Sequence, residues 1–126
     1  MINHFINGAA VAEGGYPSDL FNPSTGSKIG TVLNGGADEL DLAAQAAHTA
    51  FQSWSTTGLG YRANVLLACR QQVMDHRDEL IEICVVEAGK TFADAAAEVD
   101  KGIEGLAYAA SVGSWLRSAT TQNVSS

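Results

Sequence analysis

Residues 36–54 read GADELDLAAQAAHTAFQSW, and this stretch decides the fold. Its apolar side chains recur at steps of three, four, four and three residues, at Leu40, Ala43, Ala47, Phe51 and Trp54. Side chains at this spacing share one face of an α-helix. Gly36 is placed to cap the helix, and the acidic residues after it suit the positive end of the helix dipole. The pattern predicts a helix from about residue 37 to residue 54.

A second apolar stripe extends from about residue 59 to residue 88. Its members are Leu59, Leu66, Cys69, Val73, Leu80 and Cys84. Four polar residues, 75–78, interrupt the stripe, so we expect a bend or break with Asp78 as a new N-cap. Gly89 is placed to end this region in the left-handed conformation.

A final helix is predicted from the capping-box pattern of residues 91–94, TFAD, and should reach about Arg117. Its apolar side is formed by Phe92, Val99, Ile103, Leu106 and Ala110. The helix is rich in alanine and glycine, and interior glycines lower helix stability. We therefore expect another element to pack closely on it.

The first 36 residues have a different pattern, with both prolines and several turn signals. Short runs at residues 4–11, 20–22 and 28–33 predict two or three strands, and residues 23–26 predict a hairpin turn. The fold class is therefore mainly α: a β-hairpin region over residues 1–36, then a helical region over 37–117. That region should hold three long helices, the middle one bent or broken, and residues 118–126 form a polar tail.

Length and charge restrict the function classes. With 126 residues the chain is at most one domain, and its formal net charge is −7. An acidic chain is poorly suited to lie along phosphates or anionic membranes, so neither a nucleic acid nor a membrane is an expected partner. No apolar run is long enough for a membrane span, and the start does not resemble a signal peptide. We expect a cytoplasmic chain with two reduced cysteines.

Candidate chemistry is sparse. The groups considered are the glycine pairs Gly58/Gly60 and Gly102/Gly105, the scattered histidines His4, His48 and His76, the carboxylate pairs Asp94/Glu98 and Asp100/Glu104, and the thiols Cys69 and Cys84. Neither glycine pair follows a strand as a phosphate-binding loop does, and no histidine has further ligands at metal spacing. The carboxylates are expected on solvated helix faces. The thiols are expected on an apolar stripe, where burial raises the pKa and slows reaction. We predict no catalytic, cofactor-binding or metal residue in this chain.

Several spaced motifs resemble segments near the start of one enzyme family. In chain order they are residues 21–26 (FNPSTG), residues 40–54, Arg62 with Leu66, residues 87–91 (EAGKT), and Glu98 with Val99. With this order the chain resembles the N-terminal part of NAD-dependent aldehyde dehydrogenases. Residues 4–8 (HFING) and 89–104 are similar to one branch, the CoA-acylating methylmalonate-semialdehyde dehydrogenases.

The resemblance implies a structural role for these residues. In that family the segments that hold NAD, the catalytic cysteine and the asparagine at the oxyanion all lie further downstream, without a counterpart here. Some relatives hold a monovalent cation near the segment that matches Glu98, but the other ligands have no counterpart either. The chain itself is expected to be inactive and to need no cofactor, whereas the full-length family uses NAD and CoA.

Two hypotheses on function follow. The chain is the N-terminal fragment of a semialdehyde dehydrogenase, or it is a truncated, stand-alone helical module that self-associates or binds a partner. In either case we expect a homodimer or higher oligomer formed through helices. The final helix should expose Phe92, Val99, Ile103 and Leu106, because the rest of a cofactor domain is absent.

Overall fold

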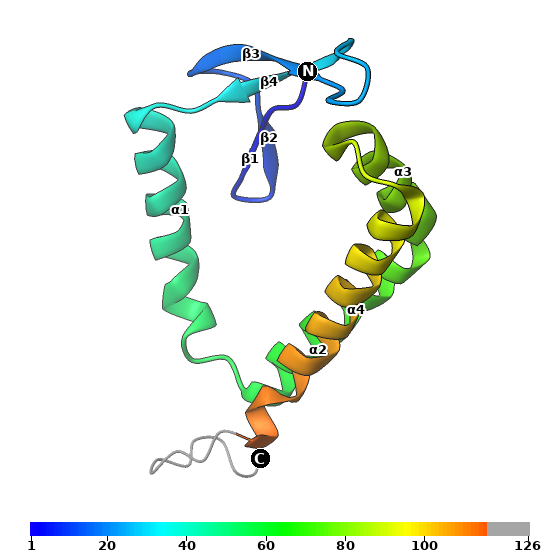
Figure 1. Ribbon diagram of the computed structural model, residues 1–126. Coiled ribbons are helices and arrows are strands. Elements are labelled where there is room, and N and C mark those ends of the chain that lie inside the picture. The colour runs from blue at the N-terminus through cyan, green and yellow to red at the C-terminus, as the bar shows by residue number, and fades with distance from the viewer. Residues whose placement is uncertain (116–126) are drawn as a thin grey trace. The chain divides into compact units, whose positions relative to one another are not determined.

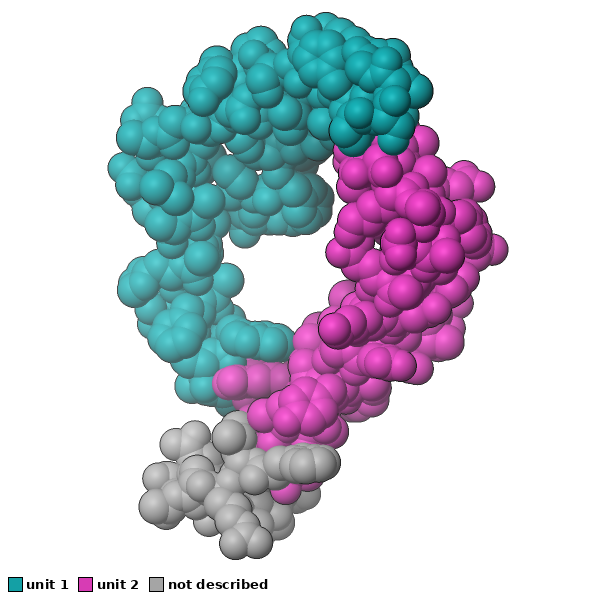
Figure 2. Space-filling view, viewed as in Figure 1, with its two compact units in different colours: residues 1–56 teal, residues 57–126 magenta. Residues whose placement is uncertain are grey.

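The computed structural model describes residues 1–115, which form four strands and four helices (Figure 1). The chain divides into two units, residues 1–56 and 57–126 (Figure 2). The first helix belongs with the strands, whereas the sequence pattern placed it with the helical region. The predicted end of the last helix at Arg117 and the polar tail 118–126 lie outside the described residues. No helix within residues 1–115 is long and apolar enough to cross a membrane.

The first unit begins with a small hairpin of β1 (His4–Ile6) and β2 (Ala9–Val11), which pair antiparallel. The sequence pattern predicted a single run over residues 4–11, and this was wrong. Asn7 and Gly8 turn the chain with φ of 53° and 78°. Two successive residues with positive φ are typical of the two-residue turns that Asn-Gly favours. The run over residues 4–11 folds back on itself at this turn and forms two strands.

The second pair of strands, β3 (Tyr16–Phe21) and β4 (Lys28–Asn34), is also antiparallel. The predicted turn between them is confirmed. Asn22 organises it: its Oδ1 accepts the Ser24 backbone N–H at 2.8 Å, and its carbonyl accepts the Gly26 N–H at 2.8 Å. Ile2 pairs alongside β4, where its carbonyl accepts the Leu33 N–H at 2.9 Å. Leu33 is the only buried hydrophobic side chain of this unit among the described residues.

Helix α1 (Ala37–Trp54) has the bounds that the apolar spacing predicts. Gly36 caps it as expected, and Glu39 Oε2 accepts the Gly36 backbone N–H at 2.6 Å. The helix contacts β1. No residue of α1 is buried. The apolar stripe found in the sequence is therefore present but largely faces solvent.

The second unit contains α2 (Leu59–Asp75), α3 (Arg77–Ala88) and α4 (Phe92–Trp115). The predicted interruption lies at His76, and the expected N-cap Asp78 is wrong because α3 already begins at Arg77. The His76 N–H donates to the Gln72 carbonyl at 3.1 Å, and the His76 carbonyl accepts the Leu80 N–H at 3.0 Å. His76 thus takes part in the last backbone hydrogen bond of α2 and the first of α3.

The core of the second unit lies where α4 packs along α2 and α3 (Figure 1). Ile81 and Ala95 have no exposed surface, and Ile103 is 8% exposed. The expectation that α4 exposes Ile103, Val99 and Leu106 is wrong: Ile103 is buried and the other two are half-buried. Helices α2 and α3 pack against the side of α4 that was expected to be exposed. Only Phe92, at 61%, is as exposed as predicted.

The burial of Ile81 predicts its effect on stability. Ile81→Ala should lower the free energy of unfolding by about 2–5 kcal/mol, because it removes buried methyl groups and leaves a cavity. Ile83→Ala is the matched control, since Ile83 lies on the same helix and is 44% exposed. Urea denaturation followed by circular dichroism measures both. Equal losses for the two variants would contradict the core assignment.

Candidate functional site

The connection between α3 and α4 carries a cluster of hydrogen-bonded polar side chains. Gly89 ends α3 with φ 65° and ψ 26°, the left-handed conformation that the sequence predicted. A side chain is strained in this conformation, which is why glycine suits the position. Lys90 follows, and its ammonium donates a hydrogen bond to the Glu98 carboxylate. This bond raises the pKa of Lys90, so the ammonium stays charged.

Thr91 caps α4 as the TFAD pattern predicted. Its Oγ1 accepts the Asp94 backbone N–H at 3.2 Å, and its hydroxyl donates to Asp94 Oδ2 at 2.7 Å. Asp94 is therefore bound to Thr91, whereas Glu98 is bound to Lys90. Asp94 and Glu98, which the sequence offered as a pair of carboxylates, therefore have separate partners and do not form one site.

A bidentate ion pair joins the start of α3 to α4. Arg77 Nε lies 2.7 Å from Asp100 Oδ1, and Nη2 lies 2.8 Å from Oδ2. Arg77 Nη1 also reaches Asp78 at 3.3 Å. The guanidinium lowers the pKa of Asp100, mainly through the hydrogen bonds, and Asp100 raises the pKa of Arg77. Asp100 is thus a structural carboxylate and not the partner of Glu104.

The glycine pairs do not form phosphate-binding loops. Gly58 caps α2 and Gly60 lies in its first turn, whereas Gly102 and Gly105 are inside α4. A Cβ atom placed on any of the four would meet nothing within 4 Å. None of them therefore lets the backbone approach another group closely, which is the usual reason for glycine in a nucleotide loop.

The thiols and histidines are dispersed. Cys69 is exposed and Cys84 is half-buried, so the expected burial of Cys69 is wrong; both are free. His4 lies in β1, His48 in α1, and His76 between α2 and α3. Within residues 1–115 no group of three histidine, cysteine, aspartate or glutamate side chains could hold a metal ion.

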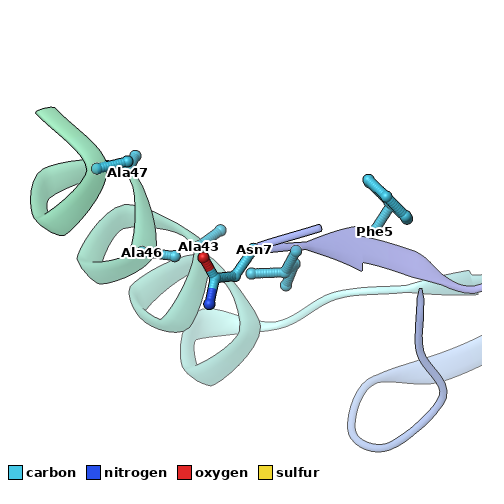
Figure 3. A pocket seen from close by; sticks show the side chains of 7 residues that line it. Phe5, Asn7, Ala43, Ala46 and Ala47 are labelled. Carbon is cyan, nitrogen blue, oxygen red and sulfur yellow. The ribbon is translucent and has the colours of Figure 1, made fainter. Parts of the chain in front are cut away.

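An apolar groove lies between the β1–β2 hairpin and α1, within the first unit (Figure 3). Its volume is about 270 Å³. It is lined by Phe5, Ile6, Asn7, Ala43, Ala46, Ala47 and Ala50. The lining has no ionisable or nucleophilic group, so the groove can hold apolar surface but supplies no acid, base or nucleophile.

Sequence reasoning missed this groove and the Arg77–Asp100 pair. Arg77 and Asp100 are 23 residues apart and lie on different helices. No local spacing could have shown that they meet. The groove depends on the hairpin at Asn7-Gly8, and that Asn-Gly signal was present in the sequence.

Comparison with known proteins gives the family. The model of the aldehyde dehydrogenase family matches residues 11–126. The chain belongs to this family. It is 37% identical over 123 residues to a malonate-semialdehyde dehydrogenase of Pseudomonas aeruginosa, and the match covers 98% of this chain. A malonate-semialdehyde dehydrogenase of Bacillus pumilus is 36% identical over 87% of this chain.

Solved structures agree with this assignment. A methylmalonate-semialdehyde dehydrogenase from Oceanimonas doudoroffii superposes with a TM-score of 0.89 at 31% identity, over 98% of this chain and 25% of that chain. A betaine aldehyde dehydrogenase variant from Staphylococcus aureus, in complex with NAD⁺, gives 0.81 at 26% identity, over 87% and 23%. The four helices and the N-terminal hairpins are thus a piece of the aldehyde dehydrogenase fold. The chain spans about a quarter of the length of the relatives that it matches: 25% of the P. aeruginosa protein and 23% of the B. pumilus protein.

The two thiols should differ in reactivity. Cys69 is exposed and should react quickly with Ellman's reagent, whereas Cys84 is half-buried and should react more slowly. Cys69→Ser should remove the fast phase, and Cys84→Ser should keep it. Two equally slow thiols would show that the side of α2 carrying Cys69 is covered.

The Arg77–Asp100 pair predicts a pH dependence of stability. The pKa of Asp100 is lowered in the folded state, so the stabilisation is present above the unfolded value of about 3.9 and is lost as pH falls through the folded value. Between pH 5 and pH 2.5, Asp100→Asn should therefore flatten the fall in the free energy of unfolding. Glu104→Gln, an exposed carboxylate of the same helix, is the control. Equal slopes for wild type and Asp100→Asn would contradict the assignment.

Proposed function

We propose that this chain supplies the N-terminal structural part of an NAD-dependent semialdehyde dehydrogenase. In that enzyme, oxidation of a semialdehyde to an acyl-CoA would be carried out by groups outside residues 1–126. The observation that carries the proposal is the extent of the match: 37% identity over 98% of this chain but only 25% of the P. aeruginosa relative. The names of the relatives support a semialdehyde as the substrate.

The described residues do not fit an NAD site of their own. The glycines of the pairs Gly58/Gly60 and Gly102/Gly105 have open space where a Cβ atom would lie, and neither pair joins a strand to a helix. The first turn of α1 already holds Glu39, whose pKa is lowered mainly by the Gly36 backbone N–H. Thr91 and Asp94 occupy the start of α4. No step involving NAD is assigned to these residues.

Exposed apolar side chains on the second unit support the structural role. Leu67 of α2 is 47% exposed, and Ile83 and Val86 of α3 are 44% and 43% exposed. These side chains lie on helices whose other sides pack against α4. Apolar surface of this kind is typical of a segment that other parts of a larger protein cover.

Complementation tests the proposal. The P. aeruginosa enzyme without the quarter that matches this chain should be inactive, and adding the 126-residue chain should restore aldehyde-dependent formation of NADH. Ile83→Asp should abolish the rescue while the helical circular dichroism signal is kept. Glu82→Gln, an exposed neighbour on the same helix, should leave the rescue unchanged.

Two results would contradict the proposal. The first is a saturable calorimetric isotherm for NAD with the chain alone, together with aldehyde oxidation. The second is no rescue although both pieces are folded, and this result would favour the stand-alone module instead.

A further inference from the structure

Two asparagines of the first unit are each followed by glycine, and the fold holds them differently. Asn7 is exposed at the turn of the β1–β2 hairpin, and Asn34 ends β4 just before Gly35. Asparagine is a chemically labile residue. A glycine after it leaves the next backbone nitrogen open to approach, because glycine has no Cβ. The two pairs share one dipeptide, so their surroundings decide how readily each reacts.

The Asn7 carboxamide is not held by a hydrogen bond to any other described residue. It lies on the wall of the groove, beside Ala43 and Ala46 (Figure 3). Gly8 is exposed too, and a Cβ atom placed on it would meet nothing within 4 Å. The strands β1 and β2 have three residues each and pair with each other in a two-stranded sheet. A hairpin of this kind is marginally stable, so its turn opens at low cost.

The Asn34 carboxamide is held in place. Its Nδ2 donates to Ser18 Oγ at 2.7 Å and to the Tyr16 carbonyl at 3.3 Å. Asn34 also pairs with Tyr16 at the end of the β3–β4 ladder. Gly35 is crowded, since a Cβ atom placed on it would lie 3.2 Å from Glu39 Cβ. A reaction of the Asn34 carboxamide with the next backbone nitrogen therefore requires both hydrogen bonds to break.

We propose that Asn7 is a site of spontaneous deamidation, with water as the only co-reactant. The Gly8 backbone nitrogen attacks Asn7 Cγ and loses its proton, Nδ2 leaves as ammonia, and a succinimide ring closes. Water then opens the ring at either carbonyl. One product is aspartate. The other is isoaspartate, in which Cγ carries the peptide bond to Gly8.

The two products change the hairpin differently. Both place a carboxylate on a groove wall that otherwise has no ionisable side chain. Aspartate tolerates positive φ as asparagine does, so this product keeps the turn in which Asn7 has φ 53°. Isoaspartate adds one carbon to the main chain of a turn whose strands pair Ile6 with Ala9. Because loop length fixes the register of a hairpin, this product disrupts the pairing of β1 with β2.

This inference goes beyond the proposed function and does not rest on it. Trypsin separates the two sites, because cleavage after Lys28 leaves Asn7 and Asn34 on different peptides. The full 126-residue chain is incubated in mildly alkaline buffer, and mass spectrometry follows the conversion of amide to acid at each asparagine. Asn7 should convert about tenfold or more faster than Asn34, because two hydrogen bonds protect Asn34. In urea, which removes this protection, the two should convert at similar rates.

Two variants test the cause. Asn7→Gln should remove the fast conversion, since glutamine must close a larger ring, and should also remove labelling by an isoaspartate methyltransferase. Ser18→Ala removes one hydrogen bond of Asn34 and should speed its conversion about twofold to tenfold. Circular dichroism checks that both variants stay folded. Equal rates for Asn7 and Asn34 in the folded chain would overturn the proposal, as would an Asn7 that converts in urea but not in the folded chain.

Discussion

The packing of α4 along α2 and α3 is the interaction on which the second unit depends. Ile81 is the one large side chain with no exposed surface among the described residues, and it lies on α3, which packs against α4. Ala95 of α4 is fully buried as well, and a small side chain suits closely packed helices. The Gly89 turn and the Thr91 cap fix where α3 ends and α4 begins. The Arg77–Asp100 pair links α3 to α4, and the Lys90–Glu98 pair links the connection between these helices to α4.

The first unit has no comparable core. Leu33 is its one buried hydrophobic side chain in the described part of the chain, and α1 contributes none. The strands are held by backbone hydrogen bonds and by the Asn22 turn, which need no core. The bounds of α1 follow from its own sequence, but no other element buries any of its residues. This contrast is consistent with a chain that spans about a quarter of the length of the relatives that it matches.

Local signals were enough to predict much of the fold. The bounds of α1, the turn at Asn22, the left-handed Gly89 and the cap at Thr91 each depend on a few neighbouring residues. The β1–β2 hairpin was missed although Asn7-Gly8 marked it. What could not be predicted is which side of each helix is covered. Ile103 was expected on the surface and is buried, whereas Cys69 was expected inside and is exposed, because both depend on how α2, α3 and α4 come together.

The prediction that the chain contains no catalytic, cofactor or metal residue stays a prediction. The structure shows what the candidate residues do instead. Asp94 binds Thr91, Glu98 binds Lys90, and Asp100 binds Arg77, so three of the four paired carboxylates have structural partners. Long-range ion pairs of this kind have no signature in a single sequence.

The central claim is that the second unit has its own core whereas α1 has no buried residue. Hydrogen exchange of the backbone amides tests this claim most directly. In the dilute chain, amides around Ile81, Ala95 and Ile103 should be the most protected, and those of α1 should exchange faster. Equal protection of α1 and α4 in the dilute chain would contradict the account.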